Sequence, residues 1–452
     1  MTTKVRFAPS PTGFLHVGNI RAAIINYLYA KKTGGKFFLR LDDTDSQRVR
    51  DGYRDMIFTD MKWLGLNYDE TFKQSERLAR YEEAKIKLLT NNRLYECFET
   101  AEELNLQRKA QSASGIAPVY NRASLKLTKE QKDELRKRGL KPHYRFLLND
   151  KPTSWDDKIK GKITYDGRHF SDPILIREED ENGFGIPTYT FCSVVDDIDF
   201  GITDIIRGED HITNTAIQIQ IFEALGVKAP HFAHLALVKA SEGKISKREG
   251  GFDVKTLRQD GYEEMAIVNL LAQIGTSESL KIYQNFEQLI HDFSFEKFSK
   301  SAMNYDIIEL TNINQKLLQI LSFAHISSRI KEIGINYNIS EKFWEICKHN
   351  INFIHEIKDW CAIFYDEFRY KNAPQDLEFL QKTVELLPQD TSQENSWQIW
   401  LEEIKKNSAR KGKELFMPIR LALTGKEHGP ELKYAINLLS RDEIIARLNF
   451  KE

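Results

Sequence analysis

The sequence predicts an α/β protein with a mostly helical C-terminal part, and three observations support this. Strand-like and helical patterns alternate over the first hundred residues, as in a parallel sheet with crossover helices. Residues 97–190 contain short strands divided by Gly, Pro and Asp turns, which is typical of an inserted α+β domain. Beyond Gly251 the apolar periodicity is helical almost throughout, which predicts an all-α domain.

These patterns divide the chain into four parts. The parallel-sheet domain comprises residues 1–96 and 191–240, and residues 97–190 are inserted between its halves. Residues 241–314 bridge to a helical domain over residues 315–452. A chain of 452 residues is long enough for several such domains.

The chain begins with a strand over Lys4–Ala8, a loop over Pro9–Asn19 and a helix over Ile20–Lys32. The loop is predicted to bind an anion because its prolines and glycines break regular structure, and the helix then offers unpaired N–H groups at its positive end. His16 adds a hydrogen-bond donor, and Gly18 leaves room for a flat base or ribose. A packed turn with a capping His and a packing Gly is the structural alternative.

The elements that follow continue the alternation. A strand ends in the acidic cluster Asp42–Asp45, at the edge of the expected sheet where ligands bind. A basic helical piece over Ala101–Gly139 opens the inserted domain, and the α/β pattern resumes at Tyr189. The other expected strands are Lys36–Leu41, His143–Leu147, Lys162–Tyr165, Ile174–Ile176, Ile205–Arg207 and His234–Val238, and the expected helices are Arg54–Leu64, Gln74–Leu89 and Thr213–Leu225.

The C-terminal half is punctuated by Pro374, Pro388 and Pro418. Apolar residues at helical spacing predict its helices. These are Tyr262–Ile274, Gln315–Phe323, Glu341–Phe364, Leu377–Leu387, Trp397–Lys406 and Arg441–Leu448.

Composition excludes several classes of protein. No apolar run is long enough to span a bilayer, and no signal peptide is visible at the start, so a cytoplasmic protein is expected. The four cysteines are far apart, which opposes a disulfide framework. The net charge of −1 gives no general support for nucleic-acid binding. Basic residues nevertheless cluster at 122–145 and 405–420, where solvated helix faces are the alternative to phosphate contacts.

A second loop, Lys244-Ile245-Ser246-Lys247-Arg248, is cationic and flanked by glycines. An adenylation reaction expels pyrophosphate, so negative charge builds on the leaving group and must be met by positioned cations. A glycine-flanked loop with two lysines and an arginine can supply them. A solvated surface loop is the alternative.

Together the two loops carry a resemblance. His16-x-Gly18-Asn19, an inserted domain and then KISKR resemble the class I aminoacyl-tRNA synthetases, which have a Rossmann-like catalytic domain. The glutamyl/glutaminyl branch is the nearer match, and bacterial glutamyl-tRNA synthetases resemble the C-terminal part. The matching stretches are Arg6–Gly13, Leu41–Asp45, Lys62–Leu66, Gln74–Arg77, Pro187–Tyr189, Val194–Asp197, Asp204–Asp210 and Met417–Gly425.

The resemblance implies that ATP and L-glutamate form glutamyl-adenylate, and that glutamate then passes to the 3′-terminal adenosine of tRNA(Glu). His16, Lys244 and Lys247 are the implied catalytic residues, with Mg²⁺ accompanying ATP as part of the substrate. The other implied ATP contacts are Pro9, Thr12, Gly13, Gly18, Asn19, Glu209, Ser246 and Arg248. A monomer is expected.

The resemblance also implies an amino-acid pocket. Arg6 and Arg207 fit the side-chain carboxylate because a guanidinium grips a carboxylate in bidentate fashion, and Asp42 fits the ammonium group. Ser10, Tyr189, Ala8 and Ser193 complete the implied pocket. Without the resemblance, Arg6 would be interpreted as a salt-bridge partner. Even with the resemblance, the alternative for Asp43 and Asp45 is that they only order their loop by capping and Asx-type bonds.

Three departures from the family pattern concern binding. Asp42 stands where many bacterial glutamyl enzymes have Glu, and Ser193 and His211 stand where Asn and Trp are frequent. Some relatives bind zinc in the inserted domain through a Cys-x-Cys pair, but here Cys97 is followed by Glu99, so no zinc and no other protein-bound metal are expected.

The implied tRNA contacts are divided between two domains. The inserted domain would grip the acceptor end, and the C-terminal domain would read the anticodon through stacking and polar contacts to bases. Relatives strict for the glutamate anticodon use an Arg in a C-terminal helix, and Ile351–Trp360 contains no Arg. We therefore expect tRNA(Gln) as a second candidate substrate.

Other functions are weighed against this one. Glutaminyl-tRNA synthetase has an anticodon region of β-barrel character, which the helical pattern after Gln315 opposes. A truncated glutamyl transferase acting on a tRNA base would lack the C-terminal domain, and a small-molecule nucleotidyltransferase would need neither that domain nor the insertion. A non-catalytic tRNA-binding paralogue is opposed by the intact His16 and Lys247.

Overall fold

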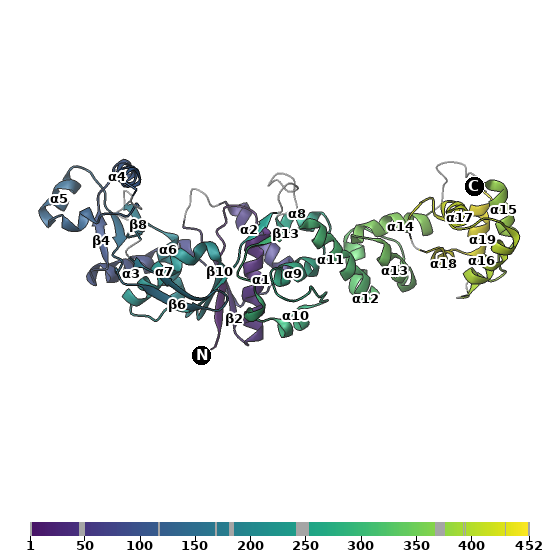
Figure 1. Cartoon of the computed structure of the whole chain (residues 1–452), viewed down its shortest axis with the longest axis horizontal. Coiled ribbons are helices and arrows are strands. Elements are labelled where there is room, and N and C mark those ends of the chain that lie inside the picture. The colour runs from purple at the N-terminus through teal and green to yellow at the C-terminus, as the bar shows by residue number, and fades with distance from the viewer. Residues whose placement is uncertain are drawn as a thin grey trace. The chain divides into compact units, whose positions relative to one another are not determined.

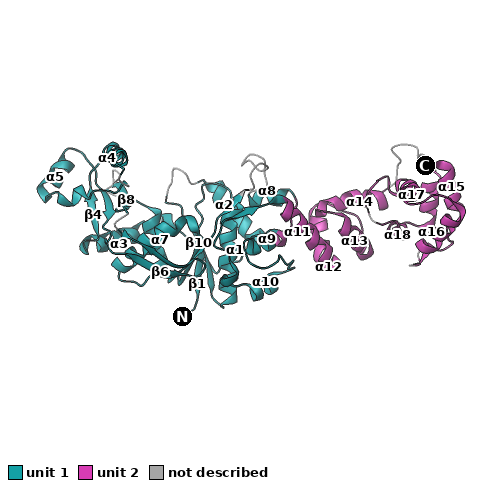
Figure 2. Cartoon of the chain, viewed as in Figure 1, with its two compact units in different colours: residues 1–260, 267–307 teal, residues 261–266, 308–452 magenta. Residues whose placement is uncertain are grey.

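The computed structural model describes residues 2–44, 50–115, 118–167, 170–179, 185–240, 253–366, 376–391, 393, 395–429 and 431–450 (Figure 1). The chain forms two compact units, residues 1–260 with 267–307 and residues 261–266 with 308–452 (Figure 2). None of the described helices is long and apolar enough to cross a membrane.

Parallel strands form the centre of the first unit. β1 (Lys4–Phe7), β2 (Lys36–Leu41) and β3 (Glu70–Lys73) pair in parallel, and β10 (Asp204–Gly208) pairs in parallel with β11 (His231–Leu235). Backbone bonds at the start of β1 join the two groups, because the Thr203 N–H donates to the Lys4 carbonyl at 2.9 Å. The expected α/β parallel-sheet fold is confirmed.

Crossover helices cover this sheet. α1 (Val17–Lys32) packs on β1, β2 and β10, and its side chains are buried on most sides. The other helical elements of the first unit's sheet region are α2 (Asp51–Trp63), η1 (Gln74–Arg77), α3 (Leu78–Thr90), α6 (Tyr189–Asp199), η4 (Glu209–His211) and α7 (Ile212–Ala224).

The inserted residues contribute to two sheets. β4 (Leu94–Cys97), β5 (His143–Phe146), β8 (Ile174–Glu179) and β9 (Gly185–Pro187) form an antiparallel sheet of their own. In contrast, β6 (Thr153–Asp157) and β7 (Gly161–Tyr165) extend the catalytic-domain sheet beside β11. The helical elements of this region are α4 (Ala101–Ala113), η2 (Ala123–Lys126) and α5 (Lys129–Lys137).

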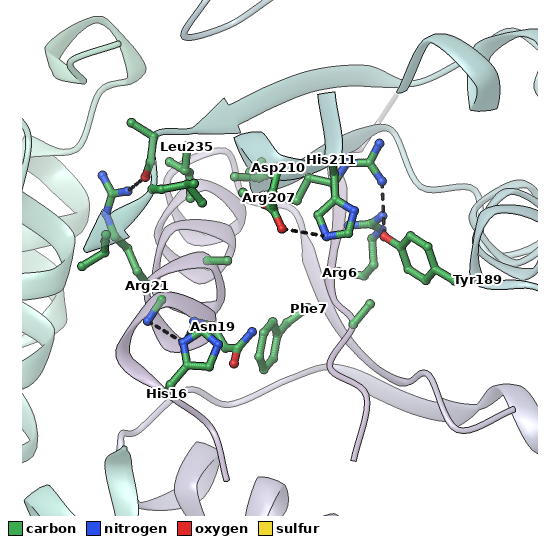
Figure 3. A pocket seen from close by; sticks show the side chains of 18 residues that line it. Arg6, Phe7, His16, Asn19, Arg21, Tyr189, Arg207, Asp210, His211 and Leu235 are labelled. Atoms are coloured by element: carbon green, nitrogen blue, oxygen red, sulfur yellow. Dashed lines mark hydrogen bonds and ion pairs between the residues drawn. The ribbon is translucent and has the colours of Figure 1, made fainter. Parts of the chain in front are cut away.

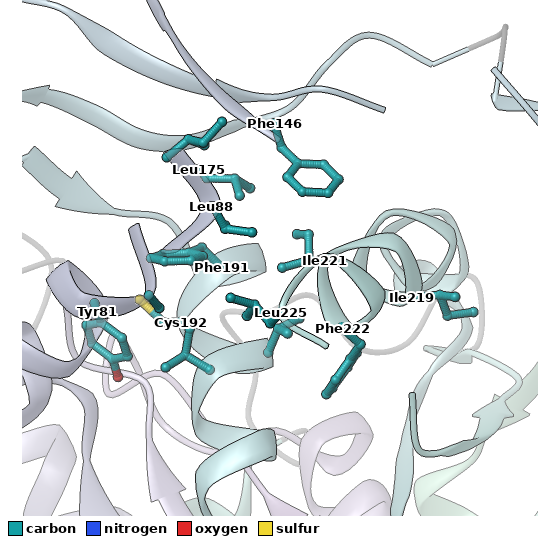
Figure 4. Packing of buried hydrophobic residues seen from close by; sticks show 14 of the residues in the cluster. Tyr81, Leu88, Phe146, Leu175, Phe191, Cys192, Ile219, Ile221, Phe222 and Leu225 are labelled. Carbon is teal, nitrogen blue, oxygen red and sulfur yellow. The ribbon is translucent and has the colours of Figure 1, made fainter. Parts of the chain in front are cut away.

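A continuous hydrophobic core joins the inserted sheet to the catalytic domain. Phe146 and Leu175 of the inserted sheet pack in the same cluster as Phe191 of α6 and Ile221 of α7 (Figure 4). Each of these four side chains is fully buried. The insertion is therefore fixed to the catalytic domain by apolar packing as well as by β6.

The remaining elements are mainly helical. The first unit continues with β12 (Val238–Ala240), α8 (Val254–Gln259), α9 (Glu264–Gln273), α10 (Phe286–Asp292), η5 (Phe295–Lys297) and β13 (Met303–Tyr305). The second unit carries α11 (Ile307–Ile320), α12 (Phe323–Glu332), α13 (Glu341–Cys347), η6 (Lys348–Asn350), η7 (Ile354–Glu356), α14 (Ile357–Phe364), α15 (Leu377–Glu385), α16 (Ser396–Asn407), α17 (Lys413–Thr424), α18 (Leu432–Ala435), η8 (Ile436–Leu438) and α19 (Arg441–Leu448).

Several sequence predictions are wrong in detail. The strand expected at His234–Val238 is β11, which ends at Leu235. The long helix expected at Glu341–Phe364 is broken near Ile351, which is extended. Pro418 does not end a helix but lies inside α17. The helix expected at Gln315–Phe323 is the second half of α11, which ends at Ile320. β3 and β6 were not predicted because each contains a single apolar side chain, Phe72 and Trp155, and β4 and β9 were not predicted either.

Candidate active site

A cavity of about 240 Å³ lies at the carboxyl ends of β1 and β10, next to the start of α1 (Figure 3). His16 and Asn19 lie at one end of it, and Arg6, Arg207 and Tyr189 gather at the other. The parallel sheet therefore places the first loop and the two predicted guanidinium groups around one space, as expected for a ligand site in an α/β fold.

His16 is the N-cap of α1. Its Nδ1 accepts hydrogen bonds from the N–H groups of Gly18 at 3.1 Å and Asn19 at 3.3 Å. An accepting Nδ1 carries no proton, so Nε2 is the nitrogen that can donate to a ligand. His16 can therefore cap the helix through Nδ1 and bind a ligand through Nε2 at the same time.

Gly18 has a packing reason to lack a side chain. A Cβ at this position would lie 3.0 Å from Cε1 and from Nδ1 of His16. The glycine therefore makes room for the imidazole that caps the helix, in addition to lining the cavity.

Arg6 is already paired inside the protein. Its Nε and Nη2 donate to the carboxylate of Asp197 at 3.0 and 3.2 Å, and both side chains are almost fully buried. Arg40 donates to the same carboxylate at 3.0 Å, to Asp42 at 2.6 and 3.2 Å, and to the hydroxyl of Ser193 at 3.0 Å. Arg40 thus joins two predicted glutamate contacts, Asp42 and Ser193, in one buried network.

This network changes the acidity of Asp42. Burial raises the pKa of the Asp42 carboxyl to about 6, against the opposing effect of Arg40. Asp42 and Ser193 are buried, and neither is among the residues that line the cavity.

Arg207 has only neutral hydrogen-bond partners among the described residues. Its Nη2 donates to the hydroxyl of Thr215 and to the side-chain oxygen of Gln218, each at 2.7 Å, and its Nη1 donates to the Tyr189 hydroxyl at 3.3 Å. Burial lowers its pKa. Among the described residues, no carboxylate lies within ion-pair distance of Arg207, so its charge is available to an anionic ligand.

His211 closes this end of the cavity. Its ring lies 5.4 Å from the Tyr189 ring, and burial together with the charge of Arg207 lowers its pKa to about 4. His211 is therefore neutral near pH 7 and does not add to the positive charge around Arg207.

The structure brings together part of the predicted site. Seven predicted residues line the cavity: Arg6, Ala8, His16, Gly18, Asn19, Tyr189 and Arg207. Pro9, Ser10, Thr12, Gly13 and Glu209 are described but are not among its lining residues. Lys244, Ser246, Lys247 and Arg248 lie outside the described residues, as does Asp45.

Two acidic residues near the site have structural partners. Glu209 pairs with Lys160 and accepts from the Leu237 N–H at 3.0 Å, and although burial opposes it, these bonds hold its pKa below the usual value. Asp43 accepts from the N–H and hydroxyl of Ser75 at 2.8 and 2.9 Å. Asp43 therefore orders its loop, which is the structural role that the sequence analysis offers for it.

Sequence reasoning missed three supporting charges. Arg40 lies in the expected strand Lys36–Leu41 and Asp197 in the matching stretch Val194–Asp197, and neither was assigned a role. Arg21, one turn into α1, lines the cavity and donates to the carbonyls of Ala236 and Ile274 at 2.9 and 3.1 Å. An Arg on the otherwise apolar stretch Ile20–Ala30 was the signal that could have indicated a buried role for it.

The residues at the position where some relatives hold zinc do not make a complete metal site. Ligand atoms of Cys97, Glu99 and His143 lie within 4.8 Å of one another. However, Glu99 already accepts from the hydroxyls of Tyr120 at 2.6 Å and Ser124 at 2.9 Å, and burial raises the pKa of the Cys97 thiol to about 11. Among the described residues there are three candidate ligands, one of them engaged by hydroxyl groups, whereas structural zinc requires four.

Comparison with known proteins identifies the family. Residues 2–312 match the catalytic domain of tRNA synthetases class I (E and Q). The chain belongs to this family. Residues 315–451 of the synthetase match an anticodon binding domain, which agrees with the helical C-terminal domain.

Similar proteins span the synthetase from end to end. It is 50% identical over 444 residues to glutamate–tRNA ligase 1 of Rickettsia felis, with 98% of each chain covered. It is 49% identical over 450 residues to glutamate–tRNA ligase 1 of Orientia tsutsugamushi, with 99% of each covered. A crystal structure of a glutamate tRNA ligase from Elizabethkingia meningosepticum in complex with its amino acid superposes with a TM-score of 0.84 at 28% identity, covering 100% of this chain and 99% of that one.

Proposed function

We propose that this synthetase is a glutamate–tRNA ligase. The observation that carries the proposal is the environment of Arg207. This buried guanidinium lies at one end of the cavity, with His16 at the other end, and its hydrogen-bond partners among the described residues are all neutral. A side-chain carboxylate is the substrate group that such a cation favours, whereas the neutral amide of glutamine leaves the charge uncompensated.

In the proposed reaction, an oxygen of the glutamate α-carboxylate attacks the α-phosphorus of ATP. The bond from that phosphorus to the bridging oxygen breaks, and pyrophosphate leaves with the electron pair. A ribose hydroxyl of the 3′-terminal adenosine of tRNA(Glu) then attacks the acyl carbon, loses its proton and expels AMP. Positioning and electrostatic stabilisation supply the rate, without a covalent enzyme intermediate.

The proposed ATP site surrounds the first loop. His16, Asn19 and the amides at the start of α1 would hold phosphates, with Gly18 near the adenosine and Mg²⁺ bound to ATP as part of the substrate. Lys244 and Lys247 would meet the charge of the departing pyrophosphate. The described ends of their segment support this, because Val238 lines the cavity and Asp253 forms a β-bridge with His16.

For the amino acid, we assign Arg207 and Tyr189 to the side-chain carboxylate and Asp42 to the ammonium group. Arg6 would support the carboxylate end while it is held by Asp197. Ala8, Ser10 and Ser193 would complete the pocket. The remaining proposed ATP contacts either order the ATP site or touch ATP itself. They are Pro9, Thr12, Gly13 and Glu209, together with Ser246 and Arg248 of the second loop.

The other parts of the chain would bind tRNA. We propose acceptor-stem contacts in residues 97–190 and 241–314, and anticodon contacts in residues 315–452. No zinc would be needed in the inserted domain, because Tyr120 and Ser124 satisfy Glu99. We propose that the protein is a monomer in the cytoplasm. The cytoplasmic location is supported by the four buried cysteines, which form no disulfide.

The test is ATP–pyrophosphate exchange with glutamate or glutamine, each with and without tRNA. Glutamate-dependent exchange, with tRNA if it is required, is expected. Exchange that prefers glutamine, or no exchange with glutamate and tRNA together, would contradict the proposal.

tRNA(Gln) is a second proposed substrate. The observation behind it is that Ile351–Trp360, at the start of α14, contains no Arg. Charging of purified tRNA(Glu) and tRNA(Gln) with glutamate tests this, and strict rejection of tRNA(Gln) would refute it.

A further inference from the structure

A line of buried polar side chains leads from the inserted segment to Arg207. Asp157, at the end of β6, contacts His234 of β11, with 2.5 Å between Oδ2 and Nδ1. The His234 Nε2 lies 2.9 Å from the hydroxyl of Thr215, and that hydroxyl accepts from Arg207 at 2.7 Å. His234 and Thr215 are completely buried, and Asp157 and Arg207 are each about 5% exposed.

The direction of each hydrogen bond follows from Asp157. Its Oδ1 accepts the backbone N–H groups of Ile159, Lys160 and His234 at 2.9–3.1 Å. Burial opposes ionisation, but these bonds and His234 hold the pKa of Asp157 below its usual value. An ionised carboxylate can only accept, so His234 carries its proton on Nδ1.

The tautomer then orients Thr215. With Nδ1 protonated, Nε2 of His234 has a lone pair and needs a donor, and among the described residues Thr215 is the donor within reach. The Thr215 hydroxyl proton therefore points to His234, although the His211 carbonyl is a competing acceptor at 3.2 Å. The hydroxyl oxygen turns its lone pairs toward Arg207.

We propose that Asp157, His234 and Thr215 are positioning residues that hold the Arg207 guanidinium in place and keep its charge for the substrate's side-chain carboxylate. The inference rests on the proposed glutamate specificity. Asp157 fixes the chain of bonds, but two neutral groups separate it from Arg207. Arg6 shows the contrast, because direct bidentate pairing with Asp197 satisfies its charge within the protein.

Thr215→Val tests the last step with almost no change of shape. It removes the acceptor for Arg207, so the KM for glutamate should rise about 10- to 100-fold, as for a lost hydrogen bond to a charged group, while the KM for ATP stays within about twofold. The selectivity for glutamate over glutamine should fall as the KM for glutamate rises. Thr215→Ser keeps the hydroxyl and should restore both values, and Thr213→Val, an exposed change on the same helix, is the control.

A second pair of variants separates positioning from packing. The shorter Asn side chain at position 234 can place its amide group only where Nδ1 of His234 lies. The longer Gln side chain can place its amide oxygen near the position of Nε2. His234→Asn should therefore behave like Thr215→Val, and His234→Gln should retain more of the glutamate affinity. Both are compared by melting temperature.

The outcomes distinguish the two claims. If the wild-type protein shows no exchange with glutamate and tRNA, the proposed activity falls and this inference falls with it. If the wild-type protein is active but Thr215→Val leaves the glutamate KM unchanged, or raises the KM values for ATP and glutamate equally, the positioning role is wrong and the activity stands.

Discussion

Arg6 and Asp197 form a buried bidentate ion pair although 191 positions separate them in the sequence. The pair joins β1, which leads into the Pro9–Asn19 loop, to α6, which follows the inserted residues. It also fixes one wall of the cavity, because Arg6 lines it. The two halves of the catalytic domain are therefore joined at the site itself.

Asp197→Asn should destabilise the protein by about 3–5 kcal/mol, because it leaves Arg6 and Arg40 buried without that charge. Chemical denaturation measures the free energy of unfolding. Asp199→Asn, two residues along α6, is the control, since Asp199 pairs with Arg77 and Arg80 near the surface and should cost about 1 kcal/mol or less. Equal effects of the two changes would contradict the special role of the Arg6 pair.

Gly18→Ala should displace the His16 imidazole, because the new Cβ would lie 3.0 Å from the ring. The cap would weaken by about 1 kcal/mol, and the KM for ATP should rise more than the KM for glutamate. Gly52→Ala, at the start of α2, is the matched control, since its Cβ would also meet no atom within 4 Å. A Gly18→Ala enzyme with wild-type ATP kinetics would rule out the coupling of His16 to ATP.

Arg207→Gln should remove the charge that selects the carboxylate. We expect kcat/KM for glutamate to fall by about 2–4 kcal/mol of transition-state stabilisation, with a smaller effect on the KM for ATP. Arg80→Gln, on an exposed part of α3, serves as the control. Unchanged discrimination between glutamate and glutamine in Arg207→Gln would assign specificity to another group.

His143 should make stability depend on pH. Burial and the neighbouring Arg145 lower its pKa from 6.5 to about 4, so the unfolded chain binds a proton that the folded protein does not. Its contribution is present above pH 6.5 and is lost as the pH falls toward 4, by at most about 3 kcal/mol. Unfolding free energies between pH 7 and 4 should show a flatter slope for His143→Gln. The exposed His291→Gln should keep the wild-type slope.

Lys247→Ala tests the second loop. Losing this cation should cost about 2–4 kcal/mol of transition-state stabilisation, by analogy with the loss of one stabilising group in other enzymes, measured as kcat for pyrophosphate exchange with tRNA present. The melting temperature should not change. Normal exchange in this variant would remove Lys247 from the mechanism.

Local sequence patterns determined much of this protein. Apolar runs indicated β1, α1 and β2 with little error, because these elements bury most of their side chains, and helical periodicity indicated α19. The motifs around His16 and Arg207 indicated a shared site, since the carboxyl ends of parallel strands meet at one edge.

Only the tertiary structure decided which charges remain available in that site. The sequence predicts the same role for Arg6 and Arg207. In the structure, however, Arg6 pairs with the carboxylate of Asp197, whereas Arg207 donates to the neutral side chains of Thr215 and Gln218. β6 contains a single apolar side chain, Trp155, which gives no strand pattern, so the contact between Asp157 and His234 could not be predicted either. The Arg6–Asp197 and Asp157–His234 pairings join residues 191 and 77 positions apart, and the charge left for a ligand depends on the partners that folding brings together.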